Sequence, residues 1–115
     1  MTPTFKKIKN NVLGRSYDLS FSYVSEARMR KAMEYKKKSA RGQSAPGRVS
    51  NVLAFPLSKT SGEILICKKA AKPFTVEYLF IHGLYHLKGL KHSVTMERNE
   101  RRTLERFGFM RNESR

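Results

Sequence analysis

Several features that mark other classes of protein are absent from this chain. It has a single cysteine, Cys67, so an internal disulfide is excluded. It has no continuous apolar run long enough to cross a bilayer, and no secretory signal pattern opens the sequence. Its 115 residues suit one domain with a modest core and leave no room for a second catalytic domain. We therefore expect a soluble, cytoplasmic protein that does not contact a membrane.

Acidic residues are also scarce. Nine Asp and Glu stand against 24 Lys and Arg, which leaves a net charge of +15. This excess is far beyond what solubility requires and indicates a polyanionic partner. No basic amphipathic helix carries large apolar residues opposite its charges, which favours nucleic acid over an anionic membrane. A merely solvated basic surface is the alternative. The basic residues are spread over residues 6–9, 36–48, 68–72 and 98–115.

All three histidines of the chain lie in one short window, residues 82–92. His82 and His86 are four residues apart, so on a helix they project from the same face and can converge on one metal ion. Gly89 allows the helix to end in a left-handed turn that carries His92 back to the same point. Three imidazoles with one open position are a common catalytic zinc arrangement, so we predict one zinc ion here. The alternative is three solvated or core histidines that bind no ion.

Such a site suits hydrolysis. A zinc ion held by three histidines lowers the pKa of its remaining water to about 7 and polarises a carbonyl or phosphoryl oxygen. The histidine spacing also coincides with the zinc-protease pattern H-E-x-x-H-x-x-G-x-x-H, but the general base of that pattern is replaced here by Gly83. A phosphodiester needs less from a carboxylate, since metal and cationic side chains can neutralise charge on the phosphoryl oxygens. The site and the net charge therefore favour the same substrate class.

Apolar periodicity predicts a small α+β domain. Residues 17–23 alternate between apolar and polar side chains, which indicates a half-buried strand. Residues 49–55, ended by Pro56, and residues 63–67 carry near-continuous apolar runs, which indicate central strands covered on both faces and joined by a turn at residues 61–62. We expect a mixed sheet of three or four strands packed by helices, with the metal site on a central helix.

Helical periodicity is found in three segments. Ser25 can cap a helix that runs to Lys38, and residues 39–47 are predicted to form a mobile loop of small residues. A second helix, with a broad apolar stripe around the first two histidines, begins at Pro73. Ser93 or Thr95 can cap a last helix that ends at Gly108. The predicted organisation is a basic N-terminal arm or edge element at residues 1–15, the domain at residues 16–110 and a frayed tail at residues 111–115.

Three segments in order carry a family resemblance. Residues 50–56 (S-N-V-L-A-F-P) and residues 62–67 (G-E-I-L-I-C) are similar to segments that read T-D/N-V-L-S-F-P and G-D-I-V-I-C in the bacterial YbeY family of single-strand-specific endoribonucleases. The resemblance covers roughly residues 17–108. The signature of that family, H-G-x-L-H-L-x-G-Y-D-H, is matched at His82, Gly83, His86, Leu87, Gly89 and His92.

The resemblance implies a function in ribosomal RNA maturation. It implies zinc held by the three histidines, a cytoplasmic location, and cleavage of single-stranded RNA at the 3′ end of the small-subunit ribosomal RNA, with the ribosome as partner and a role in ribosome quality control. An arginine of the family acts on the RNA phosphate, and Lys38, Arg41 and Arg48 are all possible counterparts here. Lys91 replaces an acidic residue of the family beside the third ligand, which bears on catalytic rate more than on metal binding.

Two other functions remain open. The first is a non-catalytic RNA-binding factor of ribosome assembly in which the metal is structural, and the second is a zinc peptidase.

Several individual side chains also have two interpretations. Glu97 and Glu100 could serve the metal site as a base or as partners of a ligand, or be solvated. Cys67 is a fourth ligand or a small buried hydrophobe, and Tyr85 and Phe74 stack on an unpaired base or belong to the core.

Overall fold

The computed structural model describes residues 1–40 and 50–113, and only the backbone of residues 37–40. The predicted loop at residues 39–47 therefore lies almost entirely outside the described residues. No helix in the described part of the chain is long and apolar enough to cross a membrane. In chain order the elements are α1 (Pro3–Leu13), β1 (Asp18–Tyr23), α2 (Glu26–Ala40), β2 (Val52–Ser58), β3 (Ser61–Ile66), the short 3-10 helix η1 (Lys68–Ala70), α3 (Val76–Leu87) and α4 (Val94–Phe107).

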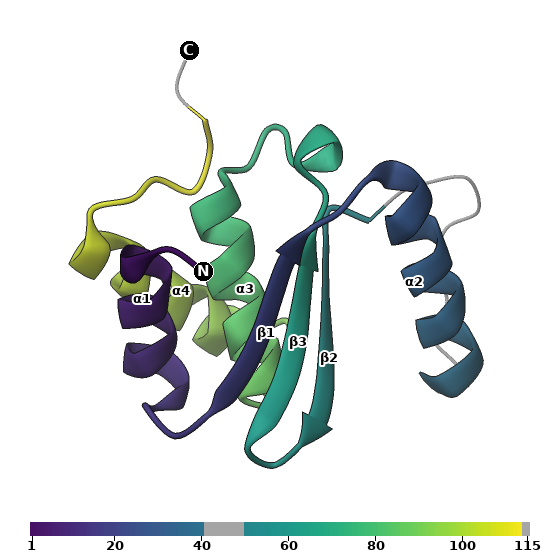
Figure 1. Ribbon diagram of the computed structural model, residues 1–115. Coiled ribbons are helices and arrows are strands. Elements are labelled where there is room, and N and C mark those ends of the chain that lie inside the picture. Colours follow the sequence, from purple (N-terminus) through teal and green to yellow (C-terminus); the bar gives the residue numbers. More distant parts are fainter. Residues whose placement is uncertain (41–49, 114–115) are drawn as a thin grey trace.

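The strands form one mixed sheet in the order β1-β3-β2. β1 runs parallel to β3, and β2 runs antiparallel to it. α1, α3 and α4 lie on one face of the sheet, and α2 lies on the other (Figure 1). The predicted α+β fold is confirmed, with a three-stranded mixed sheet and with two of the histidines on the central helix α3.

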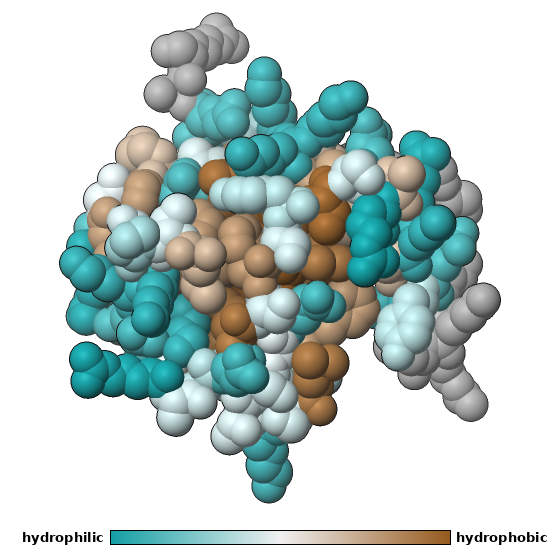
Figure 2. Space-filling model, in the orientation of Figure 1, coloured by the Kyte–Doolittle hydropathy of each residue, from teal (hydrophilic) through white to brown (hydrophobic). Residues whose placement is uncertain are grey.

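The central strand β3 separates two apolar clusters. Ile64 and Ile66 are fully buried among residues of α1, α3 and α4, whereas Leu65 packs with Met29 and Ala32 of α2. Successive side chains of a strand point to opposite faces, so a strand covered on both sides needs apolar residues in sequence. Apolar residues gather near the middle of the face shown in Figure 2, with hydrophilic residues around them. The interpretation of residues 63–67 as a central strand is confirmed.

For residues 49–55 the predicted cover on both faces is confirmed within β2, since Val52 and Ala54 pack in one cluster and Leu53 and Phe55 in the other. The predicted central position is wrong, because β2 lies at the edge of the sheet in the described part of the chain. The strand also continues through Pro56 and ends at Ser58. Proline has no backbone N–H to donate. It is tolerated there because one side of an edge strand has no neighbouring strand that needs this hydrogen bond. The turn between the two strands is at residues 59–60, so residues 61–62, predicted as the turn, already belong to β3.

Gly62 lies where the end of α3 approaches the sheet, and it leads to a stability prediction. A Cβ at this position would lie 2.9 Å from the Leu87 side chain and 3.1 Å from the backbone oxygen of Phe55, and would collide with the Tyr17 hydroxyl. Gly62→Ala should therefore lower the free energy of unfolding by roughly 1–3 kcal/mol through overpacking. Denaturant unfolding measures this change. Ser20→Ala, at an exposed position of β1, is the control and should change stability by less than about 0.5 kcal/mol; equal effects would contradict the prediction.

The N-terminal segment is a helix, not an arm or an edge element. α1 presents Phe5, Ile8 and Val12 to the core, and the Phe5 ring stacks on Phe80 of α3 with 4.3 Å between centroids. The Thr2 side chain caps the helix by accepting a hydrogen bond from the Phe5 amide at 3.1 Å. The three apolar residues are three and four positions apart, which is helical spacing. Their burial holds the helix against the core, although most other residues of the segment are polar or basic.

α3 begins later than predicted. The last described residues of the chain form backbone hydrogen bonds with the segment that precedes this helix. Thr75, rather than Pro73, is the N-cap, and its side chain accepts a hydrogen bond from the Tyr78 amide at 3.0 Å. The Thr75 amide donates to the Arg111 carbonyl at 2.9 Å, and the Glu113 amide donates to the Pro73 carbonyl at 2.8 Å. Residues 111–113 were predicted to be frayed, but these backbone groups find partners in the extended approach to α3.

Candidate metal centre

α3 is buried along most of its length and presents two histidines along its remaining edge. Leu79, Phe80 and Leu84 are almost completely inaccessible to solvent, whereas His82 and His86 are partly exposed. Residues four apart lie on one face of a helix, so burial of the other faces leaves the two imidazoles side by side. The apolar stripe of this helix therefore fixes where the histidines point.

The turn after α3 brings the third histidine to the same place. Gly89 has a φ of +99°, in the left-handed region that glycine adopts without strain. The Gly89 amide donates to the His86 carbonyl at 3.0 Å, and the Leu90 amide donates to the Tyr85 carbonyl at 3.0 Å. Ser93 then caps α4 by accepting from the Met96 amide at 3.1 Å. The predicted roles of the glycine turn and of the serine cap are confirmed.

The three imidazoles converge. The ring centroids of His82, His86 and His92 lie 4.5 to 4.9 Å apart, and one nitrogen of each ring lies within 4.8 Å of the others. The Nε2 atoms of His82 and His86 are 3.0 Å apart. His92 is exposed, so the cluster lies at the surface and not within hydrocarbon. The structure therefore brings together all three histidines that the sequence singles out.

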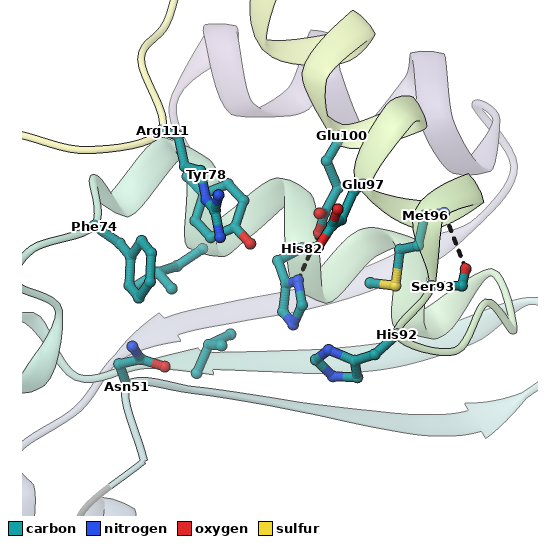
Figure 3. Close-up of a pocket in the computed structure, with 12 residues that line it drawn as sticks. Asn51, Phe74, Tyr78, His82, His92, Ser93, Met96, Glu97, Glu100 and Arg111 are labelled. Atoms are coloured by element: carbon teal, nitrogen blue, oxygen red, sulfur yellow. Dashed lines mark hydrogen bonds and ion pairs between the residues drawn. The ribbon is translucent and has the colours of Figure 1, made fainter.

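A buried carboxylate from α4 holds the first histidine. The Nδ1 atom of His82 lies 2.5 Å from Oε2 of Glu100, and the two side chains are 14% and 5% exposed (Figure 3). A carboxylate accepts a hydrogen bond from a ring N–H, so this contact favours the tautomer of His82 that carries its hydrogen on Nδ1 and leaves Nε2 on the side of the His86 ring. Metal-binding histidines in proteins commonly donate their second N–H to a carboxylate in this way.

The second histidine is neutral at physiological pH. Burial, followed by the neighbouring His82 and His92, lowers the pKa of His86 from 6.5 to about 4. A metal ion binds the neutral form of imidazole, so at pH 7 this ring does not have to lose the additional proton of the imidazolium form before it can bind. The low pKa is consistent with a metal ligand.

The donor set fits a transition-metal ion. Two nitrogen ligands of a tetrahedral zinc ion, each about 2.0–2.1 Å from it, are about 3.3 Å apart, close to the separation of the His82 and His86 Nε2 atoms. Imidazole nitrogens suit zinc, copper, iron and nickel, whereas magnesium and calcium prefer oxygen. In the described part of the chain, one group of three or more ligating side chains could hold an ion. It consists of His82, His86 and His92.

A cavity of about 270 Å³ adjoins the histidine cluster. His82 and His92 line one side of it, and Phe74, Tyr78 and Arg111 line the far end (Figure 3). The cavity thus connects the candidate metal ligands to aromatic and charged groups from α3 and from the end of the chain. A substrate that reaches the histidines can extend along it.

The two glutamates that follow the histidines differ. Glu100 is buried and paired with His82, as the functional interpretation requires, whereas Glu97 is exposed at the edge of the cavity. The signal that separates them is present in the sequence: Glu100 is four residues after Met96 and four before Leu104, so it lies on the inward face of α4. A carboxylate at an inward position needs a partner, because an unpaired buried charge is costly.

The structure describes only some of the other predicted site residues. Arg41 and Arg48 lie outside the described residues, and Lys38 is described only as backbone in α2. Cys67 is fully buried with Leu65 and Met29 and takes no part in the cluster. Tyr85 is also a core residue, and its hydroxyl lies 2.6 Å from that of Thr103.

Comparison with known proteins gives one informative similarity. No family model and no solved structure matches the chain. The sequence is 29% identical over 121 aligned residues to a protein named Endoribonuclease YbeY from Finegoldia magna, and the alignment covers 85% of this chain and 74% of that protein. The match extends well beyond the histidine window and agrees with the resemblance seen in the three sequence segments. The chain is thus similar over most of its length to a protein named Endoribonuclease YbeY, and the similar region includes the three histidines that converge in the structure.

Proposed function

We propose that this protein is a metal-dependent endoribonuclease that cleaves single-stranded RNA. The observation that carries the proposal is the convergence of three imidazoles beside an open cavity, with a buried carboxylate behind the first of them. The similarity to a protein named as an endoribonuclease supports the reaction class, and the net charge of +15 supports a polyanionic substrate.

His82, His86 and His92 would hold the ion through their ring nitrogens. When bound, such an ion supplies an activated water at neutral pH and stabilises negative charge on phosphoryl oxygens. Glu100 keeps the proton of His82 on Nδ1 and fixes the orientation of that ring. The exposed side of His92 leaves the cluster accessible from the cavity, so a phosphodiester can approach it.

The proposal also covers the identity of the ion, the location of the protein and its RNA substrate. We take zinc as the ion, the cytoplasm as the location, and the small-subunit ribosomal RNA as the substrate, with the ribosome as partner in RNA maturation and quality control. Lys38, Arg41 and Arg48 would bind RNA phosphates. The peptidase alternative lacks support because Gly83 has no side chain to act as a base, and a Cβ there would lie 3.0 Å from Ile64.

Metal analysis with a cleavage assay tests the proposal. Protein purified without added metal should contain about one ion per chain and should cleave single-stranded RNA but not a duplex of the same sequence. A chelator should stop cleavage, and zinc should restore it. A chain that never cleaves RNA and that unfolds on chelation would instead support a structural metal in an RNA-binding factor.

Binding to RNA should be strongly salt-dependent. Each phosphate contact by a lysine or arginine releases counterions, so the logarithm of affinity falls linearly with the logarithm of salt concentration. For this chain we expect affinity for single-stranded RNA to fall by tenfold or more between about 50 and 200 mM salt. Fluorescence anisotropy at several salt concentrations measures the slope. A flat response would mean that the basic residues do not contact the RNA backbone.

A further inference from the structure

Arg111 reaches the cavity beside the histidine cluster from the end of the chain. Its backbone is held on both sides: the Thr75 side chain donates to the Met110 carbonyl at 2.6 Å, the Thr75 amide donates to the Arg111 carbonyl, and Asn112 forms a bridge with Phe74. The segment therefore has a defined position against the start of α3. Its place at the cavity is a property of the fold.

Two aromatic rings orient the Arg111 side chain. The centre of the guanidinium lies 5.2 Å from the Tyr78 ring centroid and 5.5 Å from that of Phe74 (Figure 3). The Arg111 side chain also makes a hydrogen bond to the Tyr78 side chain. A guanidinium carries five N–H donors, so others remain for a ligand. Arg111 is exposed, and no ion pair holds it within the described part of the chain. The two ring contacts and the hydrogen bond to Tyr78 thus place the side chain, and its remaining N–H donors are available to a ligand.

Among the protein side chains that line the cavity are two carboxylates, whose negative charge a cation away from the histidine cluster would offset for an RNA strand. Glu97 and Glu100 line it, and their carboxylates oppose the approach of a phosphate. Among the described residues, Arg111 is the one lysine or arginine that lines this cavity, which it shares with His82 and His92. An arginine that keeps two adjacent N–H donors can bind a phosphate through two parallel hydrogen bonds.

We propose that Arg111 binds a backbone phosphate of single-stranded RNA and so holds the strand along the cavity against the histidine cluster. This inference rests on the proposed function, because it takes RNA as the ligand of the cavity. The Phe74 and Tyr78 rings position the guanidinium. The role is one of substrate binding, and it adds a residue from outside the histidine window to the proposed site.

The test compares Arg111→Gln and Arg111→Lys with Arg102→Gln in the full chain. Arg102 is exposed on α4 and does not line the cavity, so its variant removes the same charge elsewhere. Affinity is measured by fluorescence anisotropy with a labelled single-stranded RNA, within the time over which a gel shows the RNA intact. Arg111→Gln should weaken binding about tenfold and reduce the salt slope by about 0.7, as expected for one lost phosphate contact. Arg111→Lys should lie between this variant and wild type, because it keeps the charge without the planar fork.

The outcomes separate this inference from the proposed function. Melting temperature and metal content are measured for every variant, and Arg111→Lys provides the comparison if the glutamine variant is unstable. If wild type cleaves RNA and Arg111→Gln binds and cleaves like Arg102→Gln, the inference is overturned and the enzyme function stands. If wild type binds RNA without cleaving it and only the Arg111 variants bind weakly, the inference holds and the endoribonuclease proposal fails. Equal weakening by both glutamine variants, or no binding by wild type, overturns the inference.

Discussion

His86→Ala should abolish RNA cleavage while leaving most of the affinity for RNA unchanged. His86 is one of the three converging rings, with its Nε2 atom 3.0 Å from that of His82, so its loss leaves two nitrogens where three are needed. We expect metal content to fall from about one ion per chain to near zero, and cleavage to fall by about 10³-fold or more. Elemental analysis and a cleavage assay on single-stranded RNA measure the two effects.

A second ligand variant controls for folding. His92 is exposed, so His92→Ala removes a ligand without opening a gap in the core, and it should show the same loss of metal and of cleavage. Both variants should bind RNA with nearly wild-type affinity, because basic residues elsewhere on the chain provide most of that affinity. Retention of full metal content and cleavage by His92→Ala would contradict a three-histidine site. Loss of folding in His86→Ala, together with no cleavage by wild type, would support the structural metal.

The histidine cluster was predictable because its geometry is local. The four-residue spacing of His82 and His86 and the turn at Gly89 place three rings together once the segment is helical, whatever the rest of the fold does. The buried strand β3 was predictable for a similar reason, since three apolar residues in sequence need cover on both faces. Such features follow from a short stretch of chain and its periodicity.

Features that depend on distant parts of the chain were not predictable. The apolar runs of β2 and β3 are alike in sequence, and only the order of the strands, with β1 beside β3, makes β2 the edge strand that accepts Pro56. The position of Arg111 likewise depends on pairing between residues near Thr75 and the end of the chain. No periodicity within either segment indicates that they meet.

Glu100 was predictable only in part, and its substitution should have a large effect on metal affinity. Its inward position on α4 can be read from helical spacing, but its partner on α3 is 18 residues away and becomes visible only in the structure. Glu100→Gln should weaken metal binding about tenfold and Glu100→Ala up to about 100-fold. The glutamine can still accept a hydrogen bond from Nδ1 of His82 but lacks the negative charge, whereas the alanine loses both. Competition with a chromogenic chelator at pH 7 measures the affinities.

Glu97→Gln is the matched control for Glu100→Gln. It lies one turn earlier on the same helix and removes the same charge from the edge of the same cavity, but it has no hydrogen bond to a histidine among the described side chains. Its metal affinity should stay within about twofold of wild type, since exposed charges interact weakly across solvent. Equal losses in the two variants would show that overall negative charge, and not the bond from Glu100 to His82, sets the affinity. A loss confined to Glu100 would instead mean that α4 contributes to the metal centre by orienting a ligand that α3 supplies.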